Sequence, residues 1–249
     1  MENRKYILVT GASSGIGRDI AIGLSADHNI ILAGRSHETL LSVKQSCRRV
    51  EDHLIWVTDL NNIDGITESL QELLKDTTDI SGFVHCAGYL KMLPLKSISA
   101  AQLLETMNVN FNSAVLIIKA LINKKINRAV LQNVVFISST AAVMGAKAFN
   151  VYSGSKAAVN GLMRSLAVEL APAVRLNSVL PGAVQTKMTE GMFSDDESIN
   201  RMGKDYPLGL GETADIFEMV QFLLSDRSKW ITGQEFVVDG GRSINISAQ

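Results

Sequence analysis

The sequence lacks several features that would place it in a particular class of protein. Its 249 residues hold 24 lysines and arginines against 25 acidic residues, a formal net charge of −1, so the basic excess usual in nucleic-acid-binding proteins is missing. It has two cysteines, Cys47 and Cys86, and neither belongs to a CxxC pair, which argues against a disulfide framework and a zinc site. We therefore expect no nucleic-acid partner and no metal.

Long apolar runs are missing as well. No stretch approaches the roughly 18 apolar residues that a membrane-spanning helix needs, and the first apolar segment reaches Gly11 too soon for a secretory signal. We expect no membrane association and a cytoplasmic location. Hydrophobic residues make up 46% of the chain and charged residues 20%, which is ordinary for a globular protein.

Short apolar runs recur along the chain and alternate with segments of helical periodicity. Most runs are continuously apolar, as in strands that helices cover on both faces, and each ends in turn residues. The expected strands are 6–9, 29–33, 54–57, 82–85, 133–137, 176–180 and 235–238. No repeat or linker interrupts the pattern, so we predict one doubly wound, Rossmann-type α/β domain over residues 1–249, with a mostly parallel sheet of seven strands and helices on both faces.

One segment, residues 186–211, departs from this alternation. It contains several glycines, three methionines and a Ser-Asp-Asp-Glu run before Pro207. Long excursions in compact domains are often lids or binding loops, although a variable surface loop has the same composition. We expect this excursion to bind the substrate, and its methionines suit an apolar one.

The first expected strand leads into a glycine-rich turn, Thr10 to Gly17, and a helical pattern follows at once. Glycine permits a positive φ and lets the backbone approach a phosphate closely, and a helix N-terminus offers free N–H groups to it. The spacing GxxxGxG is neither the GxGxxG fingerprint nor the P-loop, so a purely structural turn is an alternative. The residues expected to hold a pyrophosphate are Gly11, Ser13, Ser14, Gly15, Ile16 and Gly17.

The end of the second expected strand bears on which nicotinamide cofactor binds. No carboxylate stands at its tip, where NAD sites hold the ribose hydroxyls, and Arg35 follows immediately. A guanidinium can hold a 2′-phosphate through two hydrogen bonds, although an exposed arginine with no ligand is also common. We expect NADP(H) in preference to NAD(H).

Tyr152 and Lys156 stand four residues apart, which places them on one face of a helix. A neighbouring ammonium favours the phenolate, and Lys156, a cationic nicotinamide ring and a hydrogen-bonding hydroxyl could jointly lower the pKa of Tyr152 from its usual value near 10 toward one suited to acid–base catalysis. Ser139, at the end of the fifth expected strand, could hold a substrate oxygen. Asn110 would need partners if buried, for example a water chain to Lys156. Taken alone, YxxxK pairs are common on solvated helices.

Taken together, these residues resemble the short-chain dehydrogenase/reductase family in its compact single-domain form. The similarity runs along almost the whole chain and is carried by ordered motifs at the family's spacing. They are TGASSGIG at 10–17, Asp59-Leu60, Cys86-Ala87-Gly88, Asn110, Ser138-Ser139, Tyr152 with Lys156, Pro181-Gly182 with Thr186, and Ile231 to Gly241. The pattern is similar to that of reductases of 3-oxoacyl thioesters on acyl carrier protein.

The resemblance implies roles for these residues. Tyr152 would be the general acid in reduction and the base in oxidation, Lys156 would bind the nicotinamide ribose, and Ser139 would hold the substrate oxygen. Asn110 would anchor a proton-relay water. Further cofactor contacts are implied for Asp59 and Leu60 at the adenine, Ala87 and Gly88 along the ribose, and Pro181, Gly182, Val184 and Thr186 around the carboxamide and diphosphate.

The chain also departs from the family pattern after the fourth strand. The family usually has Asn-Asn-Ala-Gly there, whereas this sequence has His85-Cys86-Ala87-Gly88. A hydrogen-bonding asparagine near the centre of the sheet is lost, and Cys86 can pack as a small buried residue. Ala142 stands where a glycine often follows the fifth strand. Neither change touches the proton-transfer residues.

We therefore expect an enzyme that transfers a hydride between NADP(H) and a carbonyl or alcohol, with a 3-oxoacyl thioester as one candidate substrate. Lys124, Lys125 and Arg128 could meet an acidic acyl carrier protein, unless they are simply a solvated helix end. A sugar, polyol or steroid dehydrogenase is the alternative. A non-catalytic NADP(H) sensor is disfavoured because the catalytic set is complete, and an epimerase or dehydratase of nucleotide sugars because its substrate domain would need a longer chain.

The resemblance also implies a homotetramer or homodimer. The helices around 103–121 and 152–170 would pack across a two-fold interface. Apolar faces on both helices fit that arrangement, but burial within one subunit would give the same sequence pattern.

Overall fold

The seven expected strands form one sheet in a computed structural model of the protein, which describes residues 5–75, 79–189, 199 and 202–246. Every strand pair is parallel, so the expected mostly parallel sheet is confirmed. The strands are β1 (Tyr6–Thr10), β2 (Asn29–Gly34), β3 (Leu54–Val57), β4 (Ile80–His85), β5 (Asn133–Ile137), β6 (Arg175–Pro181) and β7 (Glu235–Val238).

The strand order is β3-β2-β1-β4-β5-β6-β7. The chain therefore builds outward from β1 in one direction, returns, and builds outward from β4 in the other. In an open sheet of this kind the crevice between the two halves, at the carboxyl ends of the strands, is where ligands bind. The topology places the ends of β1 and β4 side by side at that crevice.

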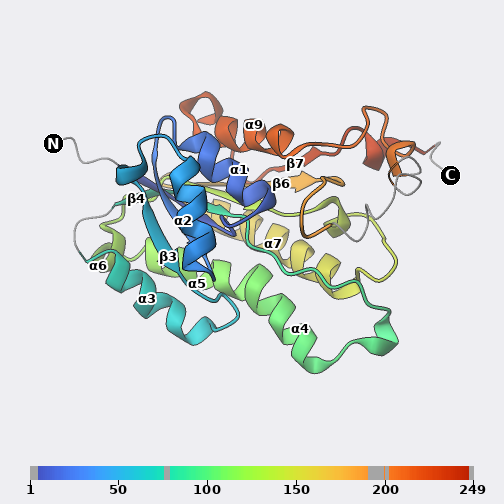
Figure 1. The fold of residues 1–249 in the computed structure, drawn as a ribbon, viewed down its shortest axis with the longest axis horizontal. Coiled ribbons are helices and arrows are strands. Elements are labelled where there is room, and N and C mark those ends of the chain that lie inside the picture. Colours follow the sequence, from blue (N-terminus) through green and yellow to red (C-terminus); the bar gives the residue numbers. More distant parts are fainter. Residues whose placement is uncertain (1–4, 76–78, 190–198, 200–201, 247–249) are drawn as a thin grey trace.

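Helices cover both faces of the sheet (Figure 1). One layer packs into the core that contains Val9, Val84 and Val135, and the other into the core that contains Leu8, Phe83 and Phe136. The first layer comprises α1 (Gly15–Leu24), α2 (His37–Ser46) and α9 (Thr213–Leu224). The second comprises α3 (Ile66–Leu73), α4 (Ala100–Met107), α5 (Ser113–Leu121) and α7 (Asn150–Glu169), with the short α6 (Lys124–Asn127) beside α5.

The apolar strands account for this double coverage. Successive side chains of a strand point to opposite faces, so in β4 Phe83 enters one core and Val84 the other. Each buried side chain of this size contributes about 1.5–3 kcal/mol by leaving water. A strand with polar residues at alternate positions would leave one face uncovered, which is why continuous apolar runs predicted the two helical layers.

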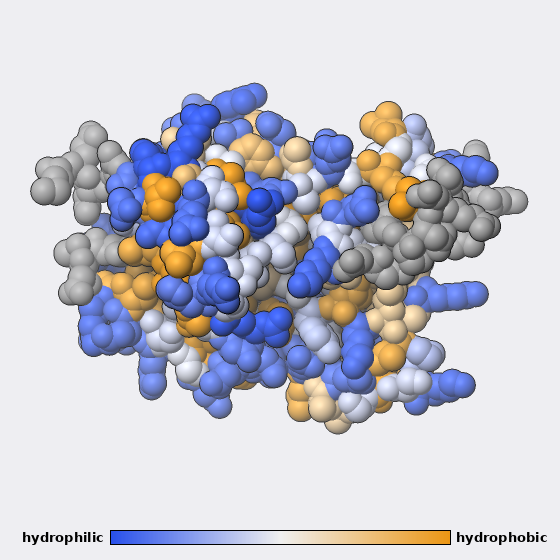
Figure 2. All heavy atoms as spheres, viewed as in Figure 1, coloured by the Kyte–Doolittle hydropathy of each residue, from blue (hydrophilic) through white to orange (hydrophobic). Residues whose placement is uncertain are grey.

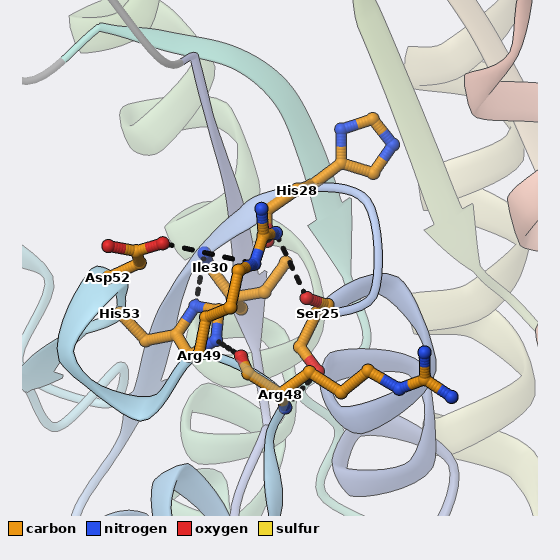
Figure 3. A network of polar contacts seen from close by, with 7 residues as sticks. All are labelled: Ser25, His28, Ile30, Arg48, Arg49, Asp52 and His53. Carbon is orange, nitrogen blue, oxygen red and sulfur yellow. Dashed lines mark hydrogen bonds and ion pairs between the residues drawn. The ribbon is translucent and has the colours of Figure 1, made fainter. Parts of the chain in front are cut away.

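A polar network joins the amino ends of β2 and β3, at the edge of the sheet away from the crevice (Figure 3). His53 is fully buried; its Nδ1 accepts a hydrogen bond from the Ile30 N–H (3.0 Å), and its Nε2 donates to the Arg48 carbonyl (2.6 Å). The Arg48 N–H donates to Ser25 Oγ, and the Arg49 guanidinium to the Ser25 carbonyl. Burial lowers the pKa of His53, so its neutral form holds the network.

The surface in the view of Figure 2 shows hydrophobic side chains in scattered groups among charged ones. Among the described residues, no helix combines the length and apolar character that crossing a bilayer requires.

Candidate active site

A cavity of about 780 Å³ opens at the carboxyl ends of the strands. Its walls come from the segments that follow β1, β2, β3, β4, β5 and β6, together with Arg242 near the C-terminus. The volume lies within the roughly 300–1,000 Å³ of small-molecule and cofactor sites. The crevice that the strand order creates is therefore a ligand-sized hollow.

The glycine-rich turn forms one wall of this cavity and fits a pyrophosphate. Gly11 and Gly15 have φ angles of +69° and +52°, which residues with a side chain rarely adopt. A Cβ on Gly17 would lie 2.3 Å from the Gly11 carbonyl oxygen, so the turn and helix can approach this closely only without one. Helix α1 begins at Gly15, and the Ser14 side chain does not cap it. Its first N–H groups are free of side-chain capping and suited to an anion.

The predicted adenosine contacts lie along the same cavity. Arg35 is exposed just past the tip of β2, where the last strand residue is Gly34 rather than a carboxylate. Asp59 and Leu60 line the cavity after β3, with Leu60 buried and Asp59 exposed. The Asp59 carboxylate accepts a hydrogen bond from the Asn61 N–H (3.0 Å), which fixes its position.

Tyr152, Lys156 and Ser139 meet at the far side of the cavity. Helix α7 carries Tyr152 and Lys156, and Lys156 Nζ lies 5.7 Å from the centre of the Tyr152 ring. The Lys156 ammonium donates to the Ile137 carbonyl (2.7 Å), which anchors it to the end of β5. Ser139 Oγ accepts a hydrogen bond from the Ala141 N–H (3.1 Å), and its hydroxyl hydrogen-bonds the Tyr152 hydroxyl.

Burial dominates the acid–base properties of this group. Burial raises the pKa of Tyr152 to about 12, although the hydrogen bond with Ser139 acts to lower that pKa. Burial also lowers the pKa of Lys156 to about 8. The expected lowering of the Tyr152 pKa includes the charge of a bound nicotinamide and stays a prediction; in the protein without cofactor, burial raises this pKa. The ammonium of Lys156 lies over the Tyr152 ring, and the loss of water around the phenol is the largest influence on its pKa.

Asn110 lies at the centre of a π-helical turn, Asn108–Asn112, that separates α4 from α5. It is fully buried. Its Oδ1 accepts from the Tyr89 N–H (2.6 Å), and its Nδ2 donates to the Tyr89 carbonyl (3.1 Å) and to Ser155 Oγ (2.8 Å). The Asn110 side chain therefore links the segment after β4 to α7 through hydrogen bonds. Both of its amide hydrogens are already donated to groups of the protein.

The remaining predicted cofactor residues also line the cavity. Ala87 and Gly88 follow β4, and the Ala87 N–H donates to Thr10 Oγ1 at the end of β1 (3.3 Å). Val184 is buried, and the Thr186 hydroxyl lies 3.1 Å from that of Thr189. The other lining residues predicted from the sequence are Pro181, Gly182, Ser13, Ser14, Ile16 and Thr186.

Several cavity residues carry no signal in the sequence and were not predicted. Those with polar or aromatic side chains come from segments far apart in the chain: Tyr89, Glu105, Thr140, Phe149 and Arg242. No motif marks them, so only the fold brings them together. Residues 190–198 and 200–201 of the predicted substrate-binding excursion lie outside the described residues. The excursion residues that line the cavity are Thr186, Lys187, Met188, Thr189, Met202, Asp205 and Tyr206.

Comparisons with known proteins agree with this geometry. A sequence profile described as "Enoyl-(Acyl carrier protein) reductase" matches residues 11–243. L-xylulose reductase of Caenorhabditis elegans is 32% identical, over 97% of this chain and 96% of its own length. Glucose 1-dehydrogenase of Gluconobacter oxydans is 29% identical, over 96% and 92%. Among solved structures, a short-chain type dehydrogenase/reductase from Mycobacterium ulcerans superposes with a TM-score of 0.86 at 30% identity, covering 97% of this chain and 90% of that one.

Proposed function

Because the chain belongs to the short-chain dehydrogenase/reductase family, oxidoreductases that use a nicotinamide cofactor on alcohols and carbonyls, we propose that it interconverts a hydroxyl and a carbonyl of a sugar or polyol with NADP(H). The observation that carries the proposal is the meeting of Ser139, Tyr152 and Lys156 inside a cavity whose other wall is the glycine-rich turn.

The chemistry of the chain's own residues follows from their protonation. Bound nicotinamide supplies or accepts the hydride. With a pKa of about 12, Tyr152 is protonated at neutral pH and ready to give its proton to a carbonyl oxygen held by Ser139. Lys156, with a pKa of about 8, is mostly ammonium at pH 7. The resting protein is therefore poised for reduction.

Oxidation makes a larger demand on the same group. Tyr152 must then act as a base, and lowering its pKa from about 12 to about 7 corresponds to about 7 kcal/mol. The Lys156 ammonium and the positive charge of an oxidised nicotinamide both act in that direction. We infer that the bound cofactor, together with Lys156, makes Tyr152 a usable base.

Polar side chains among the cavity residues support a hydroxyl-rich substrate. Tyr89 hydrogen-bonds the carboxylate of Glu105, and Arg242 faces Asp205 at 3.6 Å. Such groups can donate to and accept from sugar hydroxyls. The names of the two curated relatives, a xylulose reductase and a glucose dehydrogenase, point the same way. The profile's description names an acyl-carrier-protein reductase, but neither of these two relatives is named for a thioester, so we favour the sugar or polyol.

The basic cluster that could meet an acyl carrier protein, Lys124, Lys125 and Arg128, does not keep all three charges for such a partner. Arg128 is held by Asp79, with 2.6 Å between guanidinium and carboxylate, while Lys124 and Lys125 lie on the short helix α6. This places one of its three charges in an intramolecular ion pair. A small molecule without a carrier protein is the simpler substrate for the cavity.

NADP(H) rather than NAD(H) is supported by the tip of β2. Gly34 occupies the strand end, where an acidic residue would hold the ribose hydroxyls, and Arg35 lies on the rim of the cavity. A 2′-phosphate there would meet a guanidinium and no opposing carboxylate from the strand tip.

A homotetramer or homodimer is supported by apolar side chains left exposed on the two helices expected at its interface. Leu104 on α4 is 57% exposed and Val168 on α7 is 81% exposed. Light scattering of the purified protein tests this, with Leu104→Asp expected to lower the mass. A monomeric wild-type protein at micromolar concentration would contradict it. The cytoplasmic location stays a prediction.

A substrate panel tests the proposed activity. Purified protein is assayed with NADPH and NADH against ketoses and aldoses, with polyols in the reverse direction, and with acetoacetyl thioesters and ketosteroids as competitors. We expect the highest kcat/KM on a sugar or polyol, with NADPH preferred. Turnover confined to thioesters or steroids would overturn the substrate class, and no turnover on any of them would overturn the proposed activity.

A further inference from the structure

His85 is a buried histidine beside the catalytic group that the chemistry above does not use. It ends β4, in the segment where the family usually has a pair of asparagines, and is 1% exposed. The rings of Phe83 and Phe136 flank it, with centroids 5.8 and 6.4 Å away. A polar ring so thoroughly enclosed must be fully hydrogen-bonded to be tolerated.

Both ring nitrogens have partners, and these fix the tautomer. His85 Nε2 lies 3.2 Å from the Asn110 carbonyl oxygen, which can only accept, so Nε2 carries the proton. Nδ1 is then an acceptor, and it lies 3.1 Å from Thr10 Oγ1, whose hydroxyl donates to it. The Thr10 oxygen in turn accepts from the Ala87 N–H. The ring is held neutral, since burial lowers the pKa of His85 to about 3.

These bonds continue in one direction through the site. The Asn110 carbonyl accepts a hydrogen bond from His85 Nε2, and Asn110 Nδ2 donates one to Ser155 Oγ (2.8 Å). Ser155 donates to the Tyr152 carbonyl (2.7 Å). Asn110 lies within the π-helical turn Asn108–Asn112, which interrupts the α-helix at this position. A continuous series of hydrogen bonds thus runs from the glycine-rich turn to the backbone of the catalytic tyrosine.

We propose that His85 is a positioning residue that couples the pyrophosphate-binding turn to helix α7, by holding the Asn110 carbonyl and the Thr10 hydroxyl together across the crevice. The proposal rests on the proposed function in that it assigns a role within the same site. Substitution of His85 should move Tyr152 relative to the cofactor, and so lower kcat more than it changes KM for the substrate.

His53 provides a matched control. It is equally buried and also uses both ring nitrogens, accepting from the Ile30 N–H and donating to the Arg48 carbonyl, but near the amino ends of the strands (Figure 3). Replacing it with phenylalanine removes the same number of hydrogen bonds from the same kind of core. A loss of activity that only reflects stability would therefore appear in both variants.

The test compares His85→Phe, His85→Gln and His53→Phe at a temperature well below each midpoint of unfolding. We expect kcat to fall about tenfold or more in His85→Phe, because a misaligned Tyr152 would raise the activation free energy by about 1.4 kcal/mol. His85→Gln, whose amide can still donate to Asn110, should recover most of this rate. His53→Phe should lower the unfolding midpoint and leave kcat and KM as they are. Wild-type kcat in His85→Phe would overturn the proposal, as would an equal loss in His53→Phe.

Two further readouts do not depend on turnover. Nitrogen-15 NMR of the imidazoles should show His85 as the neutral Nε2–H tautomer at pH 7, with a shift on addition of NADPH; an Nδ1–H tautomer would contradict the proposal. NADPH binding, followed by its fluorescence, should weaken a few-fold in His85→Phe and remain unchanged in His53→Phe. If His85→Phe does not fold, Thr10→Val removes the donor to Nδ1 and should lower kcat likewise; unchanged kcat there would also overturn it. These readouts separate a failure here from a failure of the proposed activity.

Discussion

Tyr152 and Lys156 show how burial and charge compete within one site. The four-residue spacing predicts that the ammonium lowers the pKa of the phenol, yet burial raises that pKa to about 12 and lowers that of the lysine to about 8. Spacing along a helix fixes which side chains are neighbours but not how much water surrounds them. The residues were predictable from the sequence, and their protonation in the protein without cofactor was not.

Arg35 is the residue on which the proposed preference for NADP(H) over NAD(H) depends. Arg35→Asp replaces the guanidinium with a carboxylate that repels a 2′-phosphate and can accept from the ribose hydroxyls of NADH. We expect the ratio of kcat/KM for NADPH to that for NADH to fall by about 10-fold or more, about 1.4 kcal/mol. Arg18→Asp is the matched control, because Arg18 is exposed and already paired with Asp19. An unchanged ratio in Arg35→Asp would contradict the NADP(H) proposal.

At the scale of elements, the strands were the most predictable part of the fold. A continuous apolar run that ends in turn residues is typical of a buried strand, and each of the seven expected strands lies within two residues of its observed bounds. The helical segment around 103–121 was predicted without its interruption. The π-helical turn at Asn108–Asn112 depends on partners from β4 and α7, so local periodicity does not reveal it.

The turn between β1 and α1 supports a prediction of its own. In Gly17→Ala the new Cβ would lie 2.3 Å from the Gly11 carbonyl, so the turn must open, at about 1–3 kcal/mol. We expect NADPH affinity to fall at least tenfold, measured by fluorescence titration. Gly161→Ala on α7 is the control: nothing lies within 4 Å of its added Cβ, and removing an interior helix glycine should stabilise the protein by about 0.5–1 kcal/mol. Unchanged binding in Gly17→Ala would show that the turn does not hold the cofactor.

At the scale of the whole molecule, the cavity joins residues from Gly11 to Arg242. Sequence motifs predicted the cofactor side, because a phosphate needs glycine and a helix N-terminus at a fixed spacing. The substrate side, with Glu105, Asp205 and Arg242, is assembled from segments that share no motif. Its polar side chains became visible only in the fold, and together with the names of the relatives they favour a sugar over an acyl thioester.

Buried neutral histidines make the stability of the whole molecule depend on pH. Burial lowers the pKa of His85 from 6.5 to about 3, so the folded state binds the proton less well than the unfolded state. The contribution of neutral His85 to the free energy of unfolding is fully present above pH 6.5 and is lost as the pH falls toward 3. About 2 kcal/mol of it is lost by pH 5. His53 acts in the same direction.

Urea unfolding at pH 7.5 and pH 5.0 measures this dependence. We expect the free energy of unfolding to fall between the two, and to fall by about 2 kcal/mol less in His85→Gln, which has no ring to protonate. Carboxylates titrate equally in both proteins and cancel in the comparison. An equal fall in both would mean that His85 is not held neutral.

The central claim is that Tyr152 transfers the proton while the glycine-rich turn holds the cofactor, and Tyr152→Phe tests it most directly. The variant keeps the ring and its packing and removes the hydroxyl. We expect kcat on the best substrate of the panel to fall by about 10²–10⁴-fold, with NADPH affinity within about twofold of the wild type. A variant that binds NADPH and turns over at the wild-type rate would contradict the account.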